Sequence, residues 1–320
     1  MDLIYTNPAR EDLGVIHTYR LDIAFGEDEN NFELKRPASD LCCFGGSFIY
    51  MEGTEYGGIV DEIQSDTAAG EVIYTGRTWH GLLNSKILIP DPGDPYLVVT
   101  GEANTVIRSL LSRVGLEDLF EVSTADSGLM INGYSMNRYI AAYDGIKKML
   151  ATVGGKLCFT FSGGKVVLAA VSRVEYTQDG ELDSDLVDFK ARKHYNPVNH
   201  LICLGRGELA EREVLHLYAD AAGQISKKQT FFGTEERVDV YENSNAESVE
   251  DLEDGGIDRF RELARADEIE ANLSADDDQY DIQDLISATD HMTMMTVTAQ
   301  IVKKIVVVEN GQVTISYEVR

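Results

Sequence analysis

The residues that most often do acid–base or metal chemistry are few in this sequence and widely spaced. Its six histidines are His17, His80, His194, His200, His216 and His291. No two of them stand at the spacing at which one helix or strand presents two ligands to a metal. Asn196-Pro197 also interrupts the stretch between His194 and His200. The sequence therefore predicts no metal site and no cofactor.

The four cysteines are Cys42, Cys43, Cys158 and Cys203, and they fit neither a CxxC redox pair nor a zinc ribbon. We expect reduced, mostly buried thiols that pack as small apolar residues, as in a reducing cytoplasm. Cys158 and Cys203 each lie in an alternating apolar run, which is typical of a core strand. A catalytic pair of one thiol with a histidine is the alternative that the sequence leaves open.

Two further segments resemble ligand loops but lack defining residues. Gly205-Arg206-Gly207 has no third glycine and no following helix, so it favours a plain turn over a dinucleotide loop. Asp276-Asp277-Asp278 lacks the Gly and the closing Glu of a calcium loop, which favours a solvated acidic loop and leaves only weak cation binding open. No Walker, HExxH, GxSxG or EF-hand spacing occurs.

The most distinctive segment is Gly76-Arg77-Thr78-Trp79-His80-Gly81-Leu82-Leu83, which holds the only tryptophan. It follows a predicted strand directly. We interpret it as a strand end at which Trp79 enters the core and Arg77 pairs with a carboxylate or carbonyls. The alternative is a ligand clamp.

Composition narrows the function classes. The chain has 320 residues, 43% of them apolar, and 28 basic against 55 acidic residues give a net charge of −27. Such a charge argues against stable nucleic-acid binding and against docking on anionic lipid. No signal-peptide pattern and no run of about 18 apolar residues occurs, so we expect no membrane insertion. With so many carboxylates, a chance glycosidase-like pair has no diagnostic value.

Period-two alternation predicts strands through most of the first half. Helices are expected where apolar residues recur every three or four positions. The first has Asn104 as its N-cap and Gly115 beyond its end. Pro90–Pro95 marks the clearest break. The expected strands are 15–25, 47–51, 56–64, 71–75, 156–161 and 165–172, and the expected helices are 104–114 and 136–153.

The second half opens with an acidic, exposed stretch, Asp179–Asp188, and returns to strands. An amphipathic helix is expected over 257–273. The chain then closes in a long hairpin over 297–319, because Asn310-Gly311 between two alternating runs is a strong hairpin signal. The other expected strands are 200–204, 213–218, 224–230 and 238–241.

These elements predict a mainly β, α+β chain in which two β-rich regions flank a smaller α/β unit, with no βαβ alternation. The predicted domains are residues 1–95, an α/β insertion over 96–190, and a second β domain over 191–320. The last includes the helix 257–273 and the terminal hairpin 292–320.

Several segments together resemble the baseplate-hub or tail-associated proteins of long-tailed bacteriophages, especially the siphophage branch. In the resemblance, the fold-motif positions are Gly76, Arg77, Trp79, Gly205, Gly207, Asp281 and Asp284. One departure is Gln283, where that family usually has glycine. The similar segments are 14–25, 31–37, 74–83 with Ile87 and Pro90, 199–208 with Arg212 and Val214, and 280–286 before the hairpin.

The resemblance implies a structural virion protein without catalytic, cofactor or metal residues. Members form a homotrimeric ring at the distal end of the tail from two barrel-like β domains and an α/β insertion per chain. Such a ring joins the sixfold tail tube, the distal tail protein and the tape measure protein to a central spike or receptor-binding fibre, and it lines the DNA exit channel. Receptor-binding or wall-degrading modules are then expected on separate proteins.

Two other function classes stay open. One is a tail-associated cell-wall hydrolase or peptidase that uses an Asp/Glu pair or a cysteine. The other is a carbohydrate-binding module, which usually exposes several aromatic side chains on one face. For the hub, an acidic channel wall would repel DNA phosphates and favour passage over sticking.

Overall fold

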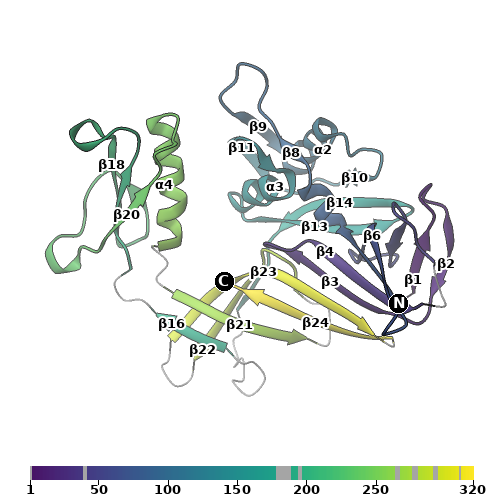
Figure 1. Cartoon of the computed structure of the whole chain (residues 1–320). Helices are drawn as coiled ribbons and strands as arrows, with labels where there is room; N and C mark the ends of the chain where they lie inside the picture. Colours follow the sequence, from purple (N-terminus) through teal and green to yellow (C-terminus); the bar gives the residue numbers. More distant parts are fainter. Residues whose placement is uncertain are drawn as a thin grey trace. The chain divides into compact units, whose positions relative to one another are not determined.

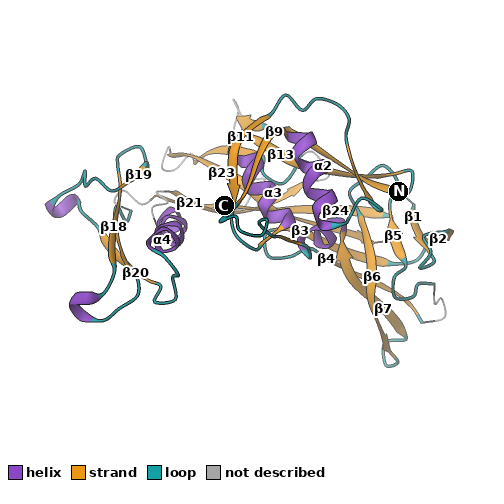
Figure 2. Cartoon of the chain, turned by 90° about the horizontal axis from the view of Figure 1, so that it is seen from above, coloured by secondary structure: helices purple, strands orange, loops and turns teal. Residues whose placement is uncertain are grey.

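The computed structural model describes residues 2–38, 42–177, 189–193, 197–263, 267–275, 280–290, 295–309 and 311–320. The chain divides into two compact units: unit 1 comprises Met1–Phe189 and Glu270–Arg320, and unit 2 comprises Lys190–Ile269. Unit 2 is therefore an insertion between the two segments of unit 1. Among the described residues, strands predominate in unit 1, whereas unit 2 has a sheet of four short strands and one long helix (Figure 2).

The largest sheet, which lies mainly in unit 1, combines strands from both ends of the chain (Figure 1). Its order is β16-β21-β24-β23-β3-β4-β7-β6-β5-β1-β2. Off this path, β22 pairs with β23, and β15 pairs with β22. The N-terminal strands are β1 Leu3–Thr6, β2 Asp12–Ile16, β3 Arg20–Gly26, β4 Asn31–Pro37, β5 Phe48–Tyr50, β6 Gly57–Asp66 and β7 Glu71–Thr78. The later strands are β15 Glu175–Thr177, β16 Phe189–Lys193, β21 Asp267–Ala275, β22 Leu285–Asp290, β23 Met295–Glu309 and β24 Gln312–Val319.

Alternation along these strands builds the core of unit 1. In β3, Leu21, Ile23 and Phe25 are fully buried, as the period-two pattern predicted. The predicted strand 15–25 is nevertheless two strands, because β2 ends at Ile16 and β3 begins at Arg20. The buried side chains of β3 stand at odd-numbered positions, but at the end of β2 the even-numbered Ile16 is buried and Val15 is exposed.

The terminal hairpin is confirmed. Strands β23 and β24 pair antiparallel up to Glu309 and Gln312, with Asn310 outside the described residues. The hairpin does not add to a sheet of unit 2. It pairs with β3, from Lys303 opposite Gly26 to Glu309 opposite Arg20.

The middle of unit 1 is a smaller α/β part. Its sheets are the three-stranded β10-β14-β13 and the pairs β9/β11 and β8/β12. Helices α2 and α3 bury their apolar stripes against these strands. The elements are α1 Trp79–Asn84, β8 Ile87–Leu88, β9 Leu97–Glu102, α2 Ala103–Val114, β10 Phe120–Val122, β11 Met130–Met136, β12 Ile140–Ala141, α3 Ala142–Ala151, β13 Gly155–Ser162 and β14 Lys165–Ser172.

Helix ends differ from the sequence expectations in two places. The N-cap of α2 is Glu102 rather than Asn104, which is buried and bonds through its amide to Ala125 and Ala170. Helix α3 begins at Ala142 rather than at Met136, because Met136 lies in β11 and Tyr139 has a positive φ of 55°. Gly115 does end α2 in the left-handed conformation, as predicted.

Unit 2 is a small sheet with a helix on one face. The sheet order is β19-β18-β17-β20, and α4 buries Leu252 and Phe260 in its core. The predicted helix 257–273 is confirmed only over 257–263: α4 begins earlier, at Val249, and ends at Leu263, and Asp267–Ala275 is strand β21. The elements are β17 His200–Leu204, η1 Leu209–Glu211, β18 Val214–Ala219, β19 Ile225–Ser226, η2 Gly233–Glu235, β20 Val238–Glu242 and α4 Val249–Leu263.

The mainly β, α+β class is confirmed by the several sheets and the four α-helices of the described residues. Within those residues the strand pairing closes no barrel. The barrel-like domains and the boundaries at 95/96 and 190/191 stay predictions. The acidic stretch 179–188 and residues 194, 276–278 and 291 lie outside the described residues.

The cap of α2 yields a pH-dependent prediction. The Glu102 carboxylate accepts hydrogen bonds from Asn104 N and Thr105 N at 3.0 and 2.8 Å and from Ser127 N at 3.1 Å. Burial raises the pKa of Glu102, but these bonds and that of the Ser127 hydroxyl outweigh burial and lower it to about 2. Its stabilisation is therefore complete above pH 4.5, the ordinary pKa, and is lost as the pH falls toward 2.

We expect Glu102→Gln to lower the free energy of unfolding by about 1 kcal/mol at pH 7. The difference from wild type should shrink as the pH falls from 4.5 toward 2. Urea titrations followed by Trp79 fluorescence measure it in unit 1, with the exposed Glu121→Gln as control. An equal loss at pH 3 and pH 7 would contradict the role of the ionised cap.

Candidate functional site

The segment Gly76–Leu83 forms the end of β7 and the start of α1. Thr78 caps α1 by accepting a hydrogen bond from Gly81 N at 3.2 Å. A Cβ at Gly76 would lie 1.9 Å from the carbonyl oxygen of Ile59 on the neighbouring strand β6. Only glycine allows this approach, so Gly76 fixes how β7 and β6 pair just before the helix.

Trp79 and Arg77 have the structural roles that we expected. The Trp79 ring is fully buried, stacks on Phe161 at 5.1 Å and meets Phe48 edge-on. Arg77 forms a two-pronged ion pair with Asp61, with N–O distances of 2.8 and 2.7 Å. The core interpretation is confirmed, because an enclosed Trp79 cannot contact a ligand.

His80 follows Trp79 and is 1% exposed. Its ring stacks on Phe25 at 4.4 Å and contacts Phe159 at 3.8 Å. Burial is the main cause that holds the pKa of His80 well below its ordinary value, and the nearby Lys147 and Lys304 act in the same direction. The imidazole is therefore neutral at neutral pH, even though Nε2 lies 3.6 Å from Glu55 Oε2.

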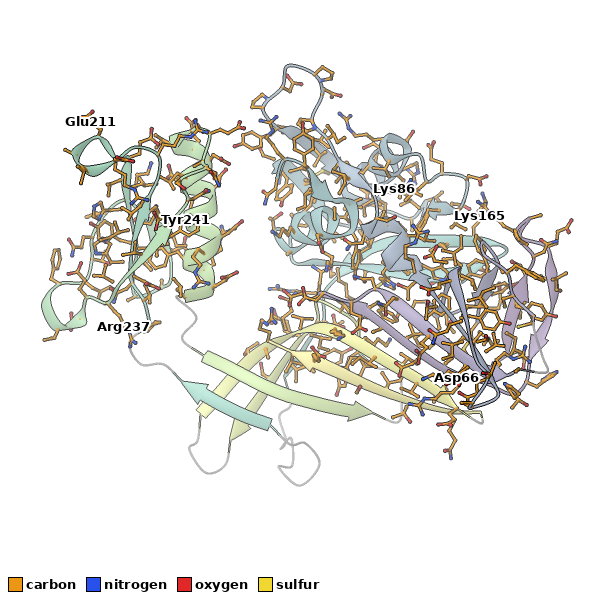
Figure 3. All side chains as sticks on the ribbon, in the orientation of Figure 1. Asp66, Lys86, Lys165, Glu211, Arg237 and Tyr241 are labelled. Atoms are coloured by element: carbon orange, nitrogen blue, oxygen red, sulfur yellow. The ribbon has the colours of Figure 1, made fainter. Side chains whose placement is uncertain are left out.

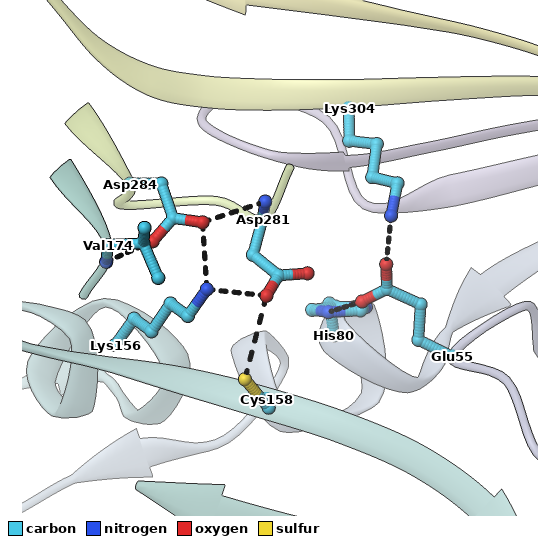
Figure 4. A network of polar contacts seen from close by, with 8 residues as sticks. All are labelled: Glu55, His80, Lys156, Cys158, Val174, Asp281, Asp284 and Lys304. Atoms are coloured by element: carbon cyan, nitrogen blue, oxygen red, sulfur yellow. Dashed lines mark hydrogen bonds and ion pairs between the residues drawn. The ribbon is translucent and has the colours of Figure 1, made fainter. Parts of the chain in front are cut away.

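Two buried lysines lie on either side of His80 (Figure 4). Lys304, on β23, is 1% exposed and places Nζ 2.7 Å from Glu55 Oε1. The rings of Phe25, Tyr56 and Tyr317 lie 5.4–5.9 Å from the same ammonium, within the range of cation–π attraction. Lys304 is thus held by one carboxylate and an aromatic cage.

The second lysine brings together two positions that the sequence singled out. Lys156 Nζ lies 2.5 Å from Asp281 Oδ2 and 2.7 Å from Asp284 Oδ2. The fully buried Asp284 also accepts from Val174 N at 2.7 Å and Asp281 N at 3.1 Å (Figure 4). Burial lowers the pKa of Lys156, but the two carboxylates outweigh it, and the pKa stays above its ordinary value.

The turn that carries these aspartates accepts a residue other than glycine. Gln283 has φ of 77°, in the left-handed region. Its backbone N donates to Ile301 O at 2.8 Å, and its side-chain amide donates to Lys147 O at 3.1 Å. The tight turn therefore forms although Gln283 stands where glycine is usual in the resembled family. The two hydrogen bonds stabilise its strained backbone.

A pocket of about 250 Å³ lies beside these ion pairs. Its wall includes Glu55, His80, Cys158, Thr160 and Asp281. Burial and the Asp281 charge raise the pKa of Cys158 to about 12, so it is a protonated thiol at neutral pH. Neither this thiol nor the enclosed, neutral His80 suits nucleophilic catalysis. The Lys156 pairs join the turn before β22 to β13 of the α/β part, and the Lys304 pair joins β23 to the segment between β5 and β6. We interpret both as structural.

The other three thiols differ in how readily they ionise. The Cys43 thiol lies 3.4 Å from Cys42 Sγ and lowers the pKa of Cys42 by hydrogen bonding, with help from Arg36. The same contact, together with burial, raises the pKa of Cys43. Burial raises the pKa of Cys203 to about 11. Cys42 is thus the cysteine most readily ionised, and it is half-buried.

Gly205 and Gly207 lie in unit 2, at the turn after β17. Gly207 has φ of 93°, and a Cβ there would lie 2.4 Å from Glu211 O. Gly205 N donates to Glu213 O at 2.8 Å, which closes the turn onto β18. The segment thus forms a turn between β17 and β18.

The sequence did not predict that His200 and His216 lie in contact. His200 on β17 lies 2.6 Å from Glu236 Oε1 through Nδ1 and 2.8 Å from His216 Nδ1 through Nε2. Antiparallel pairing of β17 with β18 places Ile202 opposite His216, which brings the two histidines to one face. Among the described residues no group of three His, Cys, Asp or Glu side chains is arranged to hold a metal ion.

Within the described residues, no helix is long and apolar enough to cross a membrane. The sequence did not identify Lys156, Lys304 or Glu55, the partner of Lys304. Their only signal was that each lysine lies within an apolar, alternating run. A charge at such a position indicates a buried partner.

Removing the buried carboxylate should cost far more than removing an exposed one. We expect Asp284→Ala to lower the free energy of unfolding by about 3 kcal/mol, because it removes one partner of the buried Lys156 and the acceptor of Val174 N. The matched control, Asp61→Ala, breaks the half-exposed pair with Arg77 and should cost no more than about 1 kcal/mol. Equal losses in urea titrations would contradict this assignment.

The strained turn gives a second comparison. Gln283→Ala and Gln283→Gly both remove the bond to Lys147 O, but only alanine keeps a Cβ in the left-handed region. We expect the glycine variant to be more stable than the alanine variant by about 0.5–1 kcal/mol. Thermal unfolding of the two proteins side by side measures the difference, and a more stable alanine variant would refute it.

Neither a protein-family model nor a curated protein matches the chain, but solved structures do. A tail protein of prophage MuSo2 from Shewanella oneidensis is 13% identical with a TM-score of 0.55, covering 100% of this chain and 98% of its own. A tail protein from Neisseria meningitidis is 11% identical with a TM-score of 0.51, covering 100% and 96%. A prophage tail protein from Listeria monocytogenes is 11% identical with a TM-score of 0.51, covering 99% and 94%.

The resemblance to bacteriophage tail proteins is thereby confirmed for the fold. The match extends through both units and is not confined to one of them. The chain therefore has the fold of these phage and prophage tail proteins over its full length.

Proposed function

We propose that this chain is a structural tail protein of a bacteriophage or prophage and has no catalytic activity. The observation that carries the proposal is the full-length likeness to three tail proteins, which covers 99–100% of the chain. The likeness extends over both compact units. The chain's most polar interior region supports the same conclusion, because the lysines there are neutralised by carboxylates and His80 is enclosed.

We further propose that three copies form a ring at the distal end of the tail. Each copy would contribute two similar β lobes, so that a threefold ring presents six units to the sixfold tube. The partners of such a ring are the tail tube, the distal tail protein, the tape measure protein and a central spike or receptor-binding fibre.

The edge of the large sheet supports assembly through strands. The sheet order ends at β2, where Leu13 and Val15 are 52% and 37% exposed. An end strand with exposed apolar side chains pairs readily with another chain. The terminal hairpin is not such an edge, because β23 and β24 are flanked by β3 and β21. We therefore place the contact between subunits at β2.

Charge supports a passage for DNA through this ring. A net charge of −27 on each copy gives the assembly a strongly negative field. Phosphates would then be repelled from a channel wall, so DNA would pass without binding.

The assembled mass tests the ring. We expect sedimentation velocity of the purified chain to give a mass close to three times 35.4 kDa. Leu13→Lys with Val15→Lys should convert the ring to monomer, while Val98→Lys, at a more exposed position on β9, should leave it intact. A wild-type monomer at all concentrations would refute self-assembly, and a lysis band in cell-wall zymography would refute the absence of catalytic activity.

A further inference from the structure

A second pocket lies in unit 1, beside Arg77, and has a volume of about 370 Å³. Its apolar wall includes Phe48, Leu82 and Leu119, and its polar wall includes Arg10, Arg77 and Lys86. Pockets of about 300–1,000 Å³ with an apolar wall and a few polar groups are typical of sites that bind a ligand or an anchoring side chain. The sites described so far do not use this pocket.

The charge of this pocket is opposite to that of the whole chain. Arg10 pairs with Asp118 at 2.7 Å, and Arg77 pairs with Asp61. Lys86 is left without an ion pair among the described side chains. The pocket thus keeps one uncompensated positive charge in a chain of net charge −27. It fits an apolar group that carries a carboxylate next to it.

This chain presents such a group on the turn between β17 and β18 of unit 2. Leu209 is 95% exposed, which is extreme for a large apolar side chain, and its φ of 52° lies in the left-handed region. Glu208 and Glu211 flank it, and Figure 3 shows Glu211 at the tip of this turn. A strained backbone that displays an apolar side chain to solvent points to a function for that residue.

We propose that Leu209 of one copy enters the Arg77 pocket of a second copy, with Glu211 facing Lys86. This inference rests on the proposed self-assembly and names one of its contacts. Two different surfaces of one chain meet in such a contact, and three identical contacts of this type close a ring. The pocket also includes Pro8 and Arg10, from the turn between β1 and β2, so it adjoins the edge strand proposed above.

Removing the anchor tests the apolar part of the contact. We expect Leu209→Ala to raise the dissociation constant of the assembly at least about tenfold, as truncation of a central anchor does. Because Leu209 is exposed, folding should be unaffected. Val249→Ala, which truncates an exposed apolar residue of the same unit, is the matched control. An unchanged dissociation constant for Leu209→Ala in a sedimentation dilution series would overturn the proposal.

Charge reversal tests the polar part. Lys86→Glu and Glu211→Lys should each weaken assembly about fivefold, and the double variant should return to within about twofold of wild type. Lys148→Glu reverses an exposed lysine elsewhere and should change little. Additive losses in the double variant would overturn the pairing. A ring that forms normally in every variant would overturn this contact and leave the proposed function standing.

A peptide separates this contact from ring formation itself. A synthetic peptide of residues 204–214 should bind the wild-type chain saturably in calorimetry, and a peptide with alanine at 209 should bind at least about tenfold more weakly. Binding should also be lost in Lys86→Glu. If the wild-type chain is monomeric but binds the peptide, the pocket assignment stands while the ring fails. No binding by the wild-type chain would overturn the pocket assignment.

Discussion

Residues 20–26 and 303–309 lie near opposite ends of the chain, yet they form adjacent antiparallel strands, and the core of unit 1 depends on this pairing. Gly26 makes the approach possible, because a Cβ there would lie 2.2 Å from Val302 O. Pairing of β23 with β3 also delivers the turn at Asp281–Asp284 to Lys156 of β13. Without it, the chain after unit 2 would not return to the sheet of unit 1, and unit 2 would not be an insertion.

The buried ion pairs make that pairing specific. Taking Lys304, Glu55, Lys156 and Asp284 out of water is unfavourable unless each charge finds its partner. A shift of β23 by one residue would turn Lys304 to the opposite face and bury Ile305 or Lys303 in its place. Lys303 pairs at the surface with Glu29 and Glu318. We infer that the two neighbouring lysines, one for each face, allow only one register.

Much of this fold is visible in the sequence because it is encoded locally. The hairpin around Gly311, the left-handed end of α2 at Gly115 and the core position of Trp79 all follow from a few adjacent residues. What could not be predicted depends on contacts between distant residues. The partner of the terminal hairpin is set by β3, and the cap of α2 by a carboxylate that Ser127 helps to hold.

The same contrast between local patterns and contacts of distant residues explains why only part of the candidate site could be predicted. Asp281 and Asp284 were identified by resemblance, but Lys156 lies more than a hundred residues away and no local pattern joins them. The enclosed Asp284 then has little freedom for chemistry, since a catalytic acid or base must exchange protons with a substrate. The Asp284 carboxylate instead accepts hydrogen bonds from Lys156 Nζ and from two backbone N–H groups. A group satisfied in this way holds the turn at Asp281–Asp284 against β13, which is the kind of role that the proposed structural function requires.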